Sequence, residues 1–400
     1  MANKNLFTYL LLAFVSVFLS ACGAVEVNKH AGKHHVHGKA PEPAETTEAP
    51  SAGNTRVVRI SGSTSIEEII PALAKKRVVF VGETHDNYAH HLSQLEIIKG
   101  LHQVYPDLAI GMEMFQKPFQ AHLDSFIAGE ISEQQFLRSS EWFDRWSFDY
   151  RLYRPILDYA REHKIPVMAL NASKELKNRV SKVGIAGLNE QERAQVPADV
   201  DRSDEKYTAR LRKIFHHHPG SNKRNFERFL DVQLLWDESM AERAAAYLKE
   251  HPSKKLVVLA GSGHLMYGSG IPQRVLRRMD VETAIVLPAD NLKLKPGIAD
   301  FLIFPETATL SKPGLMGVFL GTADEGVLVA GMVPDSAAAK AGLKKGDVIQ
   351  QLNGSAVKRP SDIKIELFEK KPGESIQLTV LRKRFLLNDQ ELDFAFDLGG

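Results

Sequence analysis

The stretch FVGETHDNYAHH, which runs from Phe80 to His91, joins an apolar run to a group of titratable side chains. Its apolar part belongs to RVVFVGE, at Arg77–Glu83, in which hydrophobic residues follow one another almost without interruption. Runs of this kind are typical of strands that are buried on both faces of a parallel sheet. The polar residues that follow then lie at the carboxyl end of a buried strand, where the chain leaves the core.

Four further apolar runs have the same character, and helical patterns separate them. The runs are LAIGMEMF (108–115), IPVMALN (165–171), KLVVLAGSGH (255–264) and ETAIVLP (282–288). In Tyr88–His102, apolar residues recur at helical spacing, and Arg151–His163 and Asn225–Glu250 show the same periodicity. No strand pattern occurs between about 173 and 250, which indicates a helical insertion. The sequence therefore predicts an α/β fold with a mostly parallel sheet flanked by helices.

Length and composition exclude several classes of protein. A chain of 400 residues favours two or three domains over one. Hydrophobic residues make up 44% and charged residues 25%, as in ordinary globular proteins. The 51 basic and 49 acidic side chains give a net charge of +2, which is unlike the strongly basic footprint of a nucleic-acid binder.

The first residues have the pattern of an export signal. Lys4 precedes an apolar segment at Leu6–Ser20, and the sequence LSAC at Leu19–Cys22 resembles a bacterial lipobox. We expect residues 1–22 to be a signal peptide and Cys22 to carry a lipid that tethers the protein to a membrane of the bacterial cell envelope. Gly23 in place of an aspartate favours the outer membrane. An ordinary cleaved signal is the alternative, and with one cysteine the chain forms no internal disulfide.

Residues 23–55 are rich in His, Pro and Ala and contain almost no large apolar side chains. This composition predicts a disordered linker. Regular structure is expected from residue 56, with a ligand-binding α/β domain at 56–300 and a short linker at 301–311.

Polar side chains stand at the ends of four predicted strands. Glu83 and His85 follow the first, Glu113 lies within the second, and Asn171 and His264 end two others. Ligands of open parallel sheets bind outside the carboxyl ends of the strands. Two imidazoles and two carboxylates make a credible set for a divalent metal or for acid–base chemistry. Each residue alone also fits a turn or an internal hydrogen bond, but their common position predicts a site.

These motifs resemble a known family. The stretches are GETH (82–85) followed by DNYAHH, then GMEMF, the tryptophans at 142 and 146, YRP (153–155) and LAGSGH (259–264). In this order they are similar to the ChaN-like haem-binding lipoproteins of iron uptake, which are grouped with the Tiki, TraB and erythromycin-esterase-like proteins. The resemblance covers about 60–300. It implies an α/β domain that binds haem.

The resemblance also implies an alternative chemistry. Tiki-type members are metal-dependent proteases with two G-x-x-H motifs and a glutamate, and both motifs are present here, at Gly82–His85 and Gly261–His264. In that case the chain is a metal-dependent hydrolase, a peptidase or esterase, with catalytic residues Glu83, His85, Glu113 and His264. The divalent metal would be held by His85, Glu113 and His264. The sequence leaves open whether the chain is an enzyme and favours a binding protein.

For haem, the iron ligand stays open between imidazole and phenol groups, and an arginine would pair with the propionates. The residues expected to contact haem are His85, Tyr88, His91, Tyr153, Arg154, His264 and Tyr267. A haem held between two copies of the chain would require a homodimer, which the sequence neither predicts nor excludes.

The last part of the chain, 312–400, resembles a PDZ domain of the HtrA protease type. The resemblance is carried by LMGV (315–318) and by DSAAAKAGLKKGDVIQQLNG (335–354). It implies a small, β-rich, partly open barrel that adds a peptide or protein C-terminus to a sheet edge. SDIKIELF (361–368) would be the groove helix. The loop that holds the peptide carboxylate would be Leu315, Met316, Gly317 and Val318. A domain that packs on its own chain without binding a peptide is the alternative.

Overall fold

The computed structural model describes residues 64–217, 225–290, 292–384 and 388–400. In these ranges no helix combines the length and the apolar character that a bilayer crossing requires. Cys22, the predicted signal peptide at 1–22 and the predicted linker at 23–55 lie outside the described residues, so the structure does not bear on them.

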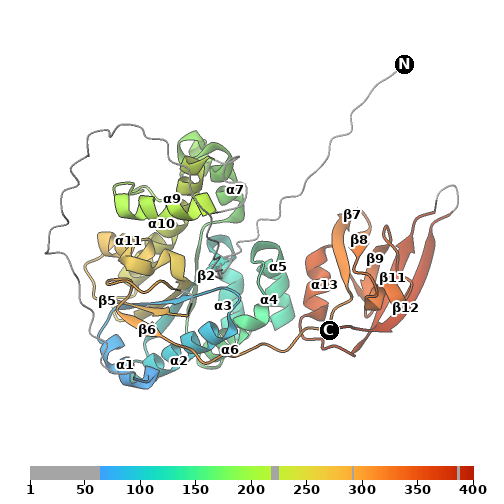
Figure 1. Cartoon of the computed structure of the whole chain (residues 1–400), viewed down its shortest axis with the longest axis horizontal. Coiled ribbons are helices and arrows are strands. Elements are labelled where there is room, and N and C mark those ends of the chain that lie inside the picture. The colour runs from blue at the N-terminus through green and yellow to red at the C-terminus, as the bar shows by residue number, and fades with distance from the viewer. Residues whose placement is uncertain (1–63, 218–224, 291, 385–387) are drawn as a thin grey trace, which may run out of the picture. The chain divides into compact units, whose positions relative to one another are not determined.

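The first part of the described chain is built on a six-stranded parallel sheet with the strand order β3-β2-β4-β1-β5-β6 (Figure 1). Its strands are β1 (Val78–Glu83), β2 (Leu108–Gln116), β3 (Val167–Asn171), β4 (Lys255–Gly261), β5 (Thr283–Pro288) and β6 (Phe301–Ile303). All five predicted strands and the parallel α/β class are confirmed. Sequence reasoning missed β6, because this strand has three residues and lies in the segment 301–311 that was assigned to a linker.

Successive side chains of the strand β1 point to opposite faces of the sheet, so the buried core is divided between these two faces. Val79 and Val81 point into one cluster of buried side chains, whereas Val78 and Phe80 point into another. The first face is covered by α1 (Ile66–Leu73), α2 (Tyr88–Val104), α3 (Gln120–Ala128) and α6 (Arg154–Glu162). The second face is covered by α10 (Phe226–Glu250) and α11 (Ile271–Arg278). Both faces are buried, which is why the strands read as continuous apolar runs.

The segment between β3 and β4 is helical, as predicted. It contains α7 (Lys174–Val183), α8 (Glu190–Arg193), α9 (Glu205–His217) and the long helix α10. Asn225 caps α10, and its side chain accepts a hydrogen bond from Arg228 N. This helix carries acidic side chains on a buried face, and one of them reaches the candidate site described below.

The aromatic stretch between β2 and β3 does not form one long helix. It follows α4 (Glu133–Ser139) and divides into α5 (Trp142–Arg145), an irregular turn and a short 3₁₀ helix at Tyr150–Leu152. Trp142 donates a hydrogen bond from Nε1 to Phe148 O at 3.2 Å, which holds the turn against the core. The turn directs the rings of Trp146 and Phe148 towards the carboxyl end of the sheet.

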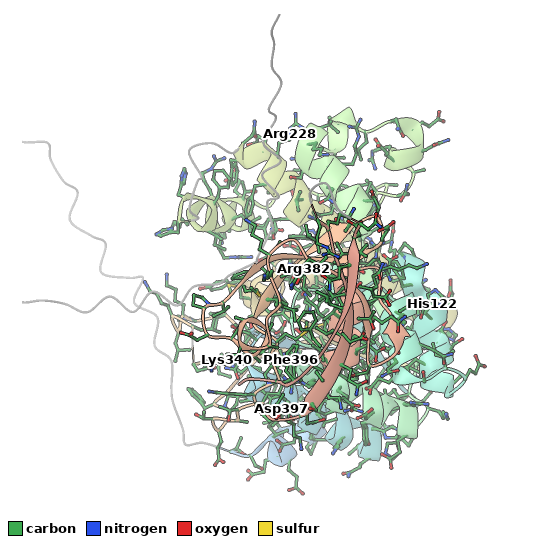
Figure 2. The ribbon with its side chains drawn as sticks, turned by 90° about the vertical axis from the view of Figure 1, so that its right-hand side faces the viewer. His122, Arg228, Lys340, Arg382, Phe396 and Asp397 are labelled. Atoms are coloured by element: carbon green, nitrogen blue, oxygen red, sulfur yellow. The ribbon has the colours of Figure 1, made fainter. Side chains whose placement is uncertain are left out.

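The last part of the chain forms an antiparallel sheet with the order β12-β11-β9-β8-β7 and a core of its own. The strands are β7 (Val318–Ala323), β8 (Gly326–Met332), β9 (Val348–Leu352), β10 (Ser355–Ala356, paired with β9), β11 (Ser375–Arg382) and β12 (Gln390–Asp397). Two helices accompany them, α12 (Ala337–Lys340) and α13 (Pro360–Leu367). Arg382 on β11, labelled in Figure 2, donates from Nε to the buried Asp347 at 2.7 Å. The sheet and helices agree with the predicted PDZ fold.

Helix α13 also contacts the first part of the chain. Arg138 on α4 donates from Nη1 to Asp362 at 2.8 Å and from Nη2 to Glu366 at 2.7 Å. Phe368, at the end of α13, packs its ring against that of Tyr150 with centroids 6.0 Å apart. The helix α13, which we predicted to line the peptide groove, therefore also contacts residues of the first domain.

Candidate functional site

Three strands of the parallel sheet bring the predicted polar residues together. Glu83 is the last residue of β1, His85 follows it by two positions, Glu113 lies on β2, and His264 ends the 3₁₀ turn after β4. Because β4 lies between β2 and β1, their carboxyl ends are neighbours. The chain thus places four residues from three distant segments at one edge of the sheet, as the strand-end pattern predicted.

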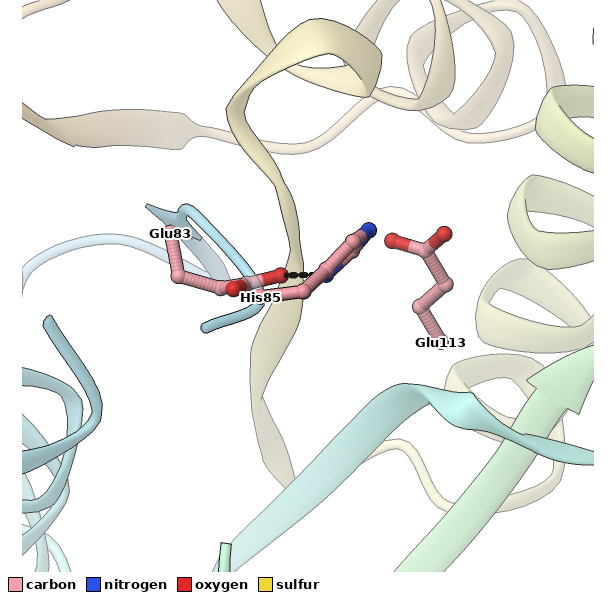
Figure 3. Close-up of side chains that lie close together, drawn as sticks. All are labelled: Glu83, His85 and Glu113. Carbon is pink, nitrogen blue, oxygen red and sulfur yellow. Dashed lines mark ion pairs between the residues drawn. The ribbon is translucent and has the colours of Figure 1, made fainter. Parts of the chain in front are cut away.

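The side chains of these residues are close enough to act as a unit, which we call the His–Glu cluster (Glu83, His85, Glu113 and His264). Glu83, His85 and Glu113 each offer one ligand atom, and these atoms lie within 4.8 Å of one another. Figure 3 shows the His85 ring between the two carboxylates, with Nδ1 paired to Glu83. His264 Nε2 lies 3.5 Å from Glu113 Oε1. Glu113 therefore stands between the two imidazoles.

A further acid, which sequence reasoning missed, completes the arrangement. Asp237 on α10 places Oδ1 2.5 Å from His264 Nδ1, and the phenol of Tyr207 donates to Asp237 Oδ2 at 2.5 Å. A carboxylate on one ring nitrogen fixes the orientation and tautomer of a histidine. The sequence does contain a hint of this acid: in LLWDESM (234–240), acidic residues interrupt the apolar face of a helix. However, no rule of sequence spacing connects a residue on a covering helix with the ends of the strands.

Backbone contacts hold Glu113 in position. Gly261 N donates to its Oε2 at 2.7 Å, and Asn171 Nδ2 donates to its main-chain oxygen at 3.0 Å. Asn171 therefore supports a cluster residue rather than joining the cluster. A side chain at position 261 would place Cβ only 3.0 Å from His85 Cε1, so the close packing of the cluster requires glycine there.

The electrostatics of the cluster favour charged imidazoles. Burial acts to lower the pKa of His85, but the neighbouring Glu83 outweighs it and raises this pKa to about 8. Burial also acts against the charged form of His264, but Glu113 and Asp237 raise its pKa to about 9. For Glu83, burial favours the neutral acid, yet the adjacent histidines leave its pKa lowered. These shifts favour the imidazolium forms of His85 and His264 and the carboxylate form of Glu83.

Aromatic rings surround the cluster and leave two imidazoles partly accessible. Trp146 and Phe148 each lie 4.9 Å from the His85 ring, and Trp236 lies 6.1 Å from the His264 ring. The His85 side chain is 10% exposed and that of His264 is 14% exposed. A ligand that approaches this edge therefore meets apolar walls and two ring nitrogens.

Two residues expected to contact haem are instead fully engaged inside the fold. His91 is buried, and its two ring nitrogens lie 3.1 Å from Gln94 Oε1 and 3.2 Å from His85 O. Tyr153 is also buried and donates its hydroxyl to His85 O at 3.1 Å. Both residues thus hold the loop that carries His85. Their contact with haem, which the resemblance implies, stays a prediction.

The other expected haem contacts have different surroundings. Tyr88 begins α2 and is half-buried against the first core cluster. Arg154 pairs with Glu133 at 2.7 Å and with Glu369 at 2.6 Å, so its charge is already compensated. Tyr267 is 39% exposed and has a φ of 65°, a strained conformation for this residue, three positions after His264. Of this group, Tyr267 is the residue with both exposure and proximity in the chain to the cluster.

The donor set of the cluster also suits a divalent metal. Imidazole nitrogens and carboxylate oxygens are ligands of zinc and of non-haem iron. Glu83 lies between two imidazoles: its Oε1 is paired with His85 Nδ1, and its Oε2 lies 3.8 Å from His91 Nε2. The ligand atoms that lie within 4.8 Å of one another belong to Glu83, His85 and Glu113, so these three residues could hold a metal. The expected set of His85, Glu113 and His264 stays a prediction, with His264 Nε2 3.5 Å from Glu113 Oε1.

The fold and the cluster together define a class of protein: an α/β domain with a polar site at the carboxyl edge of a parallel sheet, followed by a PDZ-like domain. The family model described as "Haem-binding uptake, Tiki superfamily, ChaN" matches residues 69–275. The chain belongs to this family. The model of the PDZ domain matches residues 314–395, so the chain also carries a PDZ domain.

Individual relatives match different shares of the chain. A probable periplasmic serine endoprotease DegP-like protein of Brucella suis is 48% identical over 65 residues, which are 16% of this chain and 13% of that protein. Protein RETICULATA-RELATED 5, chloroplastic, of Arabidopsis thaliana is 25% identical over 277 residues, which are 60% of this chain and 35% of that protein. The chain thus spans only a small part of the first of these relatives and about a third of the second.

A solved structure shares the fold of the first domain. ChaN of Campylobacter jejuni, described with cofacial haem binding, superposes with a TM-score of 0.50 at 20% identity. The match covers 61% of this chain and 92% of the ChaN chain. It agrees with the parallel sheet and flanking helices described above.

Proposed function

We propose that this protein binds haem at the carboxyl edge of its parallel sheet and serves iron acquisition in the bacterial cell envelope. The observation that carries this proposal is membership of a haem-binding family together with accessible iron-ligand side chains at that edge. Haem iron takes His or Tyr as an axial ligand in an apolar setting. His264 and Tyr267 meet this requirement, because both are partly exposed and Trp236 supplies an apolar wall.

A cation for the haem propionates lies beside these residues. The guanidinium carbon of Arg210 is 5.5 Å from the centroid of the Tyr267 ring, and its Nη2 donates to Ser269 Oγ at 2.6 Å. Burial lowers the pKa of Arg210, which indicates that its charge is incompletely compensated inside the fold. A propionate would compensate it. This arginine replaces Arg154 as the residue we assign to the propionates.

Haem titration tests the proposal directly. Ferric haem added to the full chain should give a shifted Soret band that saturates, and either His264→Ala or Tyr267→Phe should alter that band by removing the axial ligand. Tyr105→Phe is the matched control, since Tyr105 lies just before β2 at the opposite end of the sheet. A chain that gives no Soret shift would exclude haem binding. A normal shift in both variants would instead exclude these two ligands.

The proposal for the cellular setting rests on the two ends of the chain. Lipid attachment at Cys22 would tether the protein to a membrane, most simply the outer membrane, and the PDZ domain would bind the C-terminus of a partner through Leu315, Met316, Gly317 and Val318. Leu315 is 52% exposed, which suits a contact with a partner. Membrane fractionation of Cys22→Ala tests the anchor; release of this variant is the expected result, and unchanged membrane association would contradict it.

Haem binding also allows a test of self-association. If haem is held between two copies of the chain, size-exclusion chromatography should show a dimer when haem is added and a monomer without it. The same elution volume with and without haem would exclude this haem-linked dimer.

A second function is supported by the His–Glu cluster itself. We propose as the alternative a metal-dependent hydrolase, in which His85, Glu113 and His264 hold a divalent metal and Glu83 or Glu113 accepts a proton. A bound divalent metal would supply a Lewis acid at this edge. The acids of the cluster are buried and the histidines are already paired with them. These side chains could therefore bind a metal and transfer a proton without a large rearrangement.

Elemental analysis separates the two functions on one sample. The hydrolase predicts one divalent metal per chain after purification without added ligand, and loss of that metal together with ester or peptide hydrolysis in His264→Ala. Haem binding predicts haem iron with its Soret band. Metal-free protein that hydrolyses nothing and still binds haem would eliminate the hydrolase.

A further inference from the structure

A cavity opens on the first domain, and no residue of the His–Glu cluster lines it. It has a volume of about 990 Å³ and lies between the ends of β2 and β3, helices α7 and α8 and the middle of α10. This is at the upper end of the range for sites that bind small molecules. The charged side chains of its lining are Lys117, Glu190, Arg193 and Glu242.

The lining excludes haem coordination by this cavity. None of its lining residues is a His, Tyr, Cys or Met, the side chains that ligate haem iron. None belongs to the His–Glu cluster either. A ligand of this cavity is therefore recognised by chemistry other than that proposed above.

The charges of the cavity come in balanced pairs. Lys117 and Glu242 face each other with Nζ 3.4 Å from Oε2, and Arg193 and Glu190 stand on α8. The Lys117 and Glu242 side chains are 31% and 42% exposed. An ion pair this accessible contributes at most about 1 kcal/mol to stability, so a ligand that brings its own two charges can replace it at little cost. The cavity as a whole favours a ligand that carries both signs.

A buried hydroxyl without a partner lines the cavity. Ser239 on α10 is 1% exposed, and its Oγ makes no hydrogen bond with any described residue. Leaving a buried hydroxyl unpaired is unfavourable, and a ligand atom in the cavity would satisfy it. Ser173 stands on another wall as the N-cap of α7, and its Oγ accepts a hydrogen bond from Leu176 N.

We propose that this cavity binds a small zwitterion with a free ammonium and a free carboxylate group, of the class of an amino acid or a short unblocked peptide. The carboxylate lies against Lys117, and the ammonium lies against Glu242 or Glu190. Ser239 hydrogen-bonds a polar atom of the ligand. The apolar surfaces of Leu176 and Val196 take up its side chain.

Calorimetry with simple probes tests the ligand class. Alanine and alanylalanine distinguish an amino acid from a peptide, and one of them should bind the full chain with saturable heat. N-acetylated and C-amidated alanylalanine each lose one charge and should bind at least about tenfold more weakly, the loss expected for one charge-assisted hydrogen bond. No heat from either probe, or equal binding of the blocked peptides, would overturn the proposal.

Substitutions test the location. Lys117→Met and Glu242→Gln should each weaken binding about tenfold, and Ser239→Ala about threefold, the loss expected for one neutral hydrogen bond. Ser239→Ala should remain folded, because its hydroxyl stabilises nothing in the described structure. Glu282→Gln is the matched control, since it breaks an exposed pair with Lys76 at the amino end of the sheet. Equal affinity in all four variants, or displacement of the probe by haem, would overturn a separate zwitterion site.

Discussion

Asp237 Oδ1 lies 2.5 Å from Nδ1 of His264, and the opposite ring nitrogen, Nε2, faces Glu113 at 3.5 Å. Three elements supply these groups: a long helix, a 3₁₀ turn after β4 and the strand β2. Asp237 therefore orients the imidazole through Nδ1, and the ring presents Nε2 to the other residues of the cluster. Any ligand that takes this nitrogen must also replace a proton, because the pKa of His264 is raised to about 9.

Removing the charge behind His264 should lower its pKa. Asp237→Asn keeps the size of the side chain but removes one of the three carboxylates that stabilise the imidazolium, so we expect the pKa of His264 to fall from about 9 towards its ordinary value of 6.5. NMR titration of the imidazole measures this. In Tyr207→Phe the carboxylate keeps its charge, so His264 should stay closer to the wild type than in Asp237→Asn; equal pKa values in wild type and Asp237→Asn would contradict the assigned role.

The raised histidine pKa values predict a loss of stability in alkali. A group whose pKa is higher in the folded than in the unfolded state stabilises fully below its unfolded value, here 6.5, and loses that contribution as the pH rises through its folded value. These folded values are about 8 for His85 and about 9 for His264. We therefore expect the free energy of unfolding to fall by an amount on the order of a few kcal/mol between pH 6.5 and 9.5.

Urea denaturation at a series of pH values checks this expectation. The double variant His85→Asn with His264→Asn should show a much smaller decline over the same range, whatever its stability at pH 6.5. A decline of equal size in the double variant would assign the effect to other groups. At the acid end, the lowered pKa of Glu83 predicts a second loss of stability as the pH falls below 4.5 through its folded value.

The glycine that packs against His85 offers a steric test. Gly261→Ala would place Cβ 3.0 Å from His85 Cε1, closer than an ordinary contact, so the imidazole or the strand must shift. We expect a loss of about 1–3 kcal/mol in the free energy of unfolding, as for other overpacked interiors, and a changed NMR titration of His85. Gly321→Ala on β7, where a Cβ meets nothing nearer than 3.7 Å, is the control and should change stability far less. A cluster unaffected by Gly261→Ala would mean that this close approach is not required.

The sequence predicted the parallel sheet well because both of its faces are buried. Runs such as Val78–Val81 are apolar at every position, and the helices between the runs have clear hydrophobic periodicity. The hydrophobic pattern of the sequence therefore matches the burial of these residues in the folded chain. The three-residue strand β6 escaped because Phe301–Ile303 is too short to show a pattern and is a strand only through its pairing with β5.

The sequence predicted the residues of the site that lie at strand ends but not the residue that a covering helix contributes. Glu83, His85, Glu113 and His264 stand at strand ends, and the rule that such ends converge connects them without any knowledge of distances. Asp237 follows no such rule, because it lies on α10, a helix that packs on one face of the sheet and is not the end of a strand. Likewise, the sequence offers Tyr153 and Tyr267 alike as haem contacts, and burial separates Tyr153, which is enclosed, from Tyr267, which is accessible.

The contact between the PDZ domain and the first domain provides a last prediction. Arg138 on α4 donates to both Asp362 and Glu366 on α13, while Phe368 packs on Tyr150. These ion pairs are partly buried, so Arg138→Ala should cost about 1–2 kcal/mol through the loss of two charge-assisted hydrogen bonds, and the loss should shrink at high salt. Arg179→Ala removes a single, more exposed pair with Glu192 within the first domain and is the control. If α13 holds the two domains together, limited proteolysis between residues 304 and 314 should be faster in Arg138→Ala than in Arg179→Ala; equal cleavage rates would show that the two ion pairs do not restrain the PDZ domain.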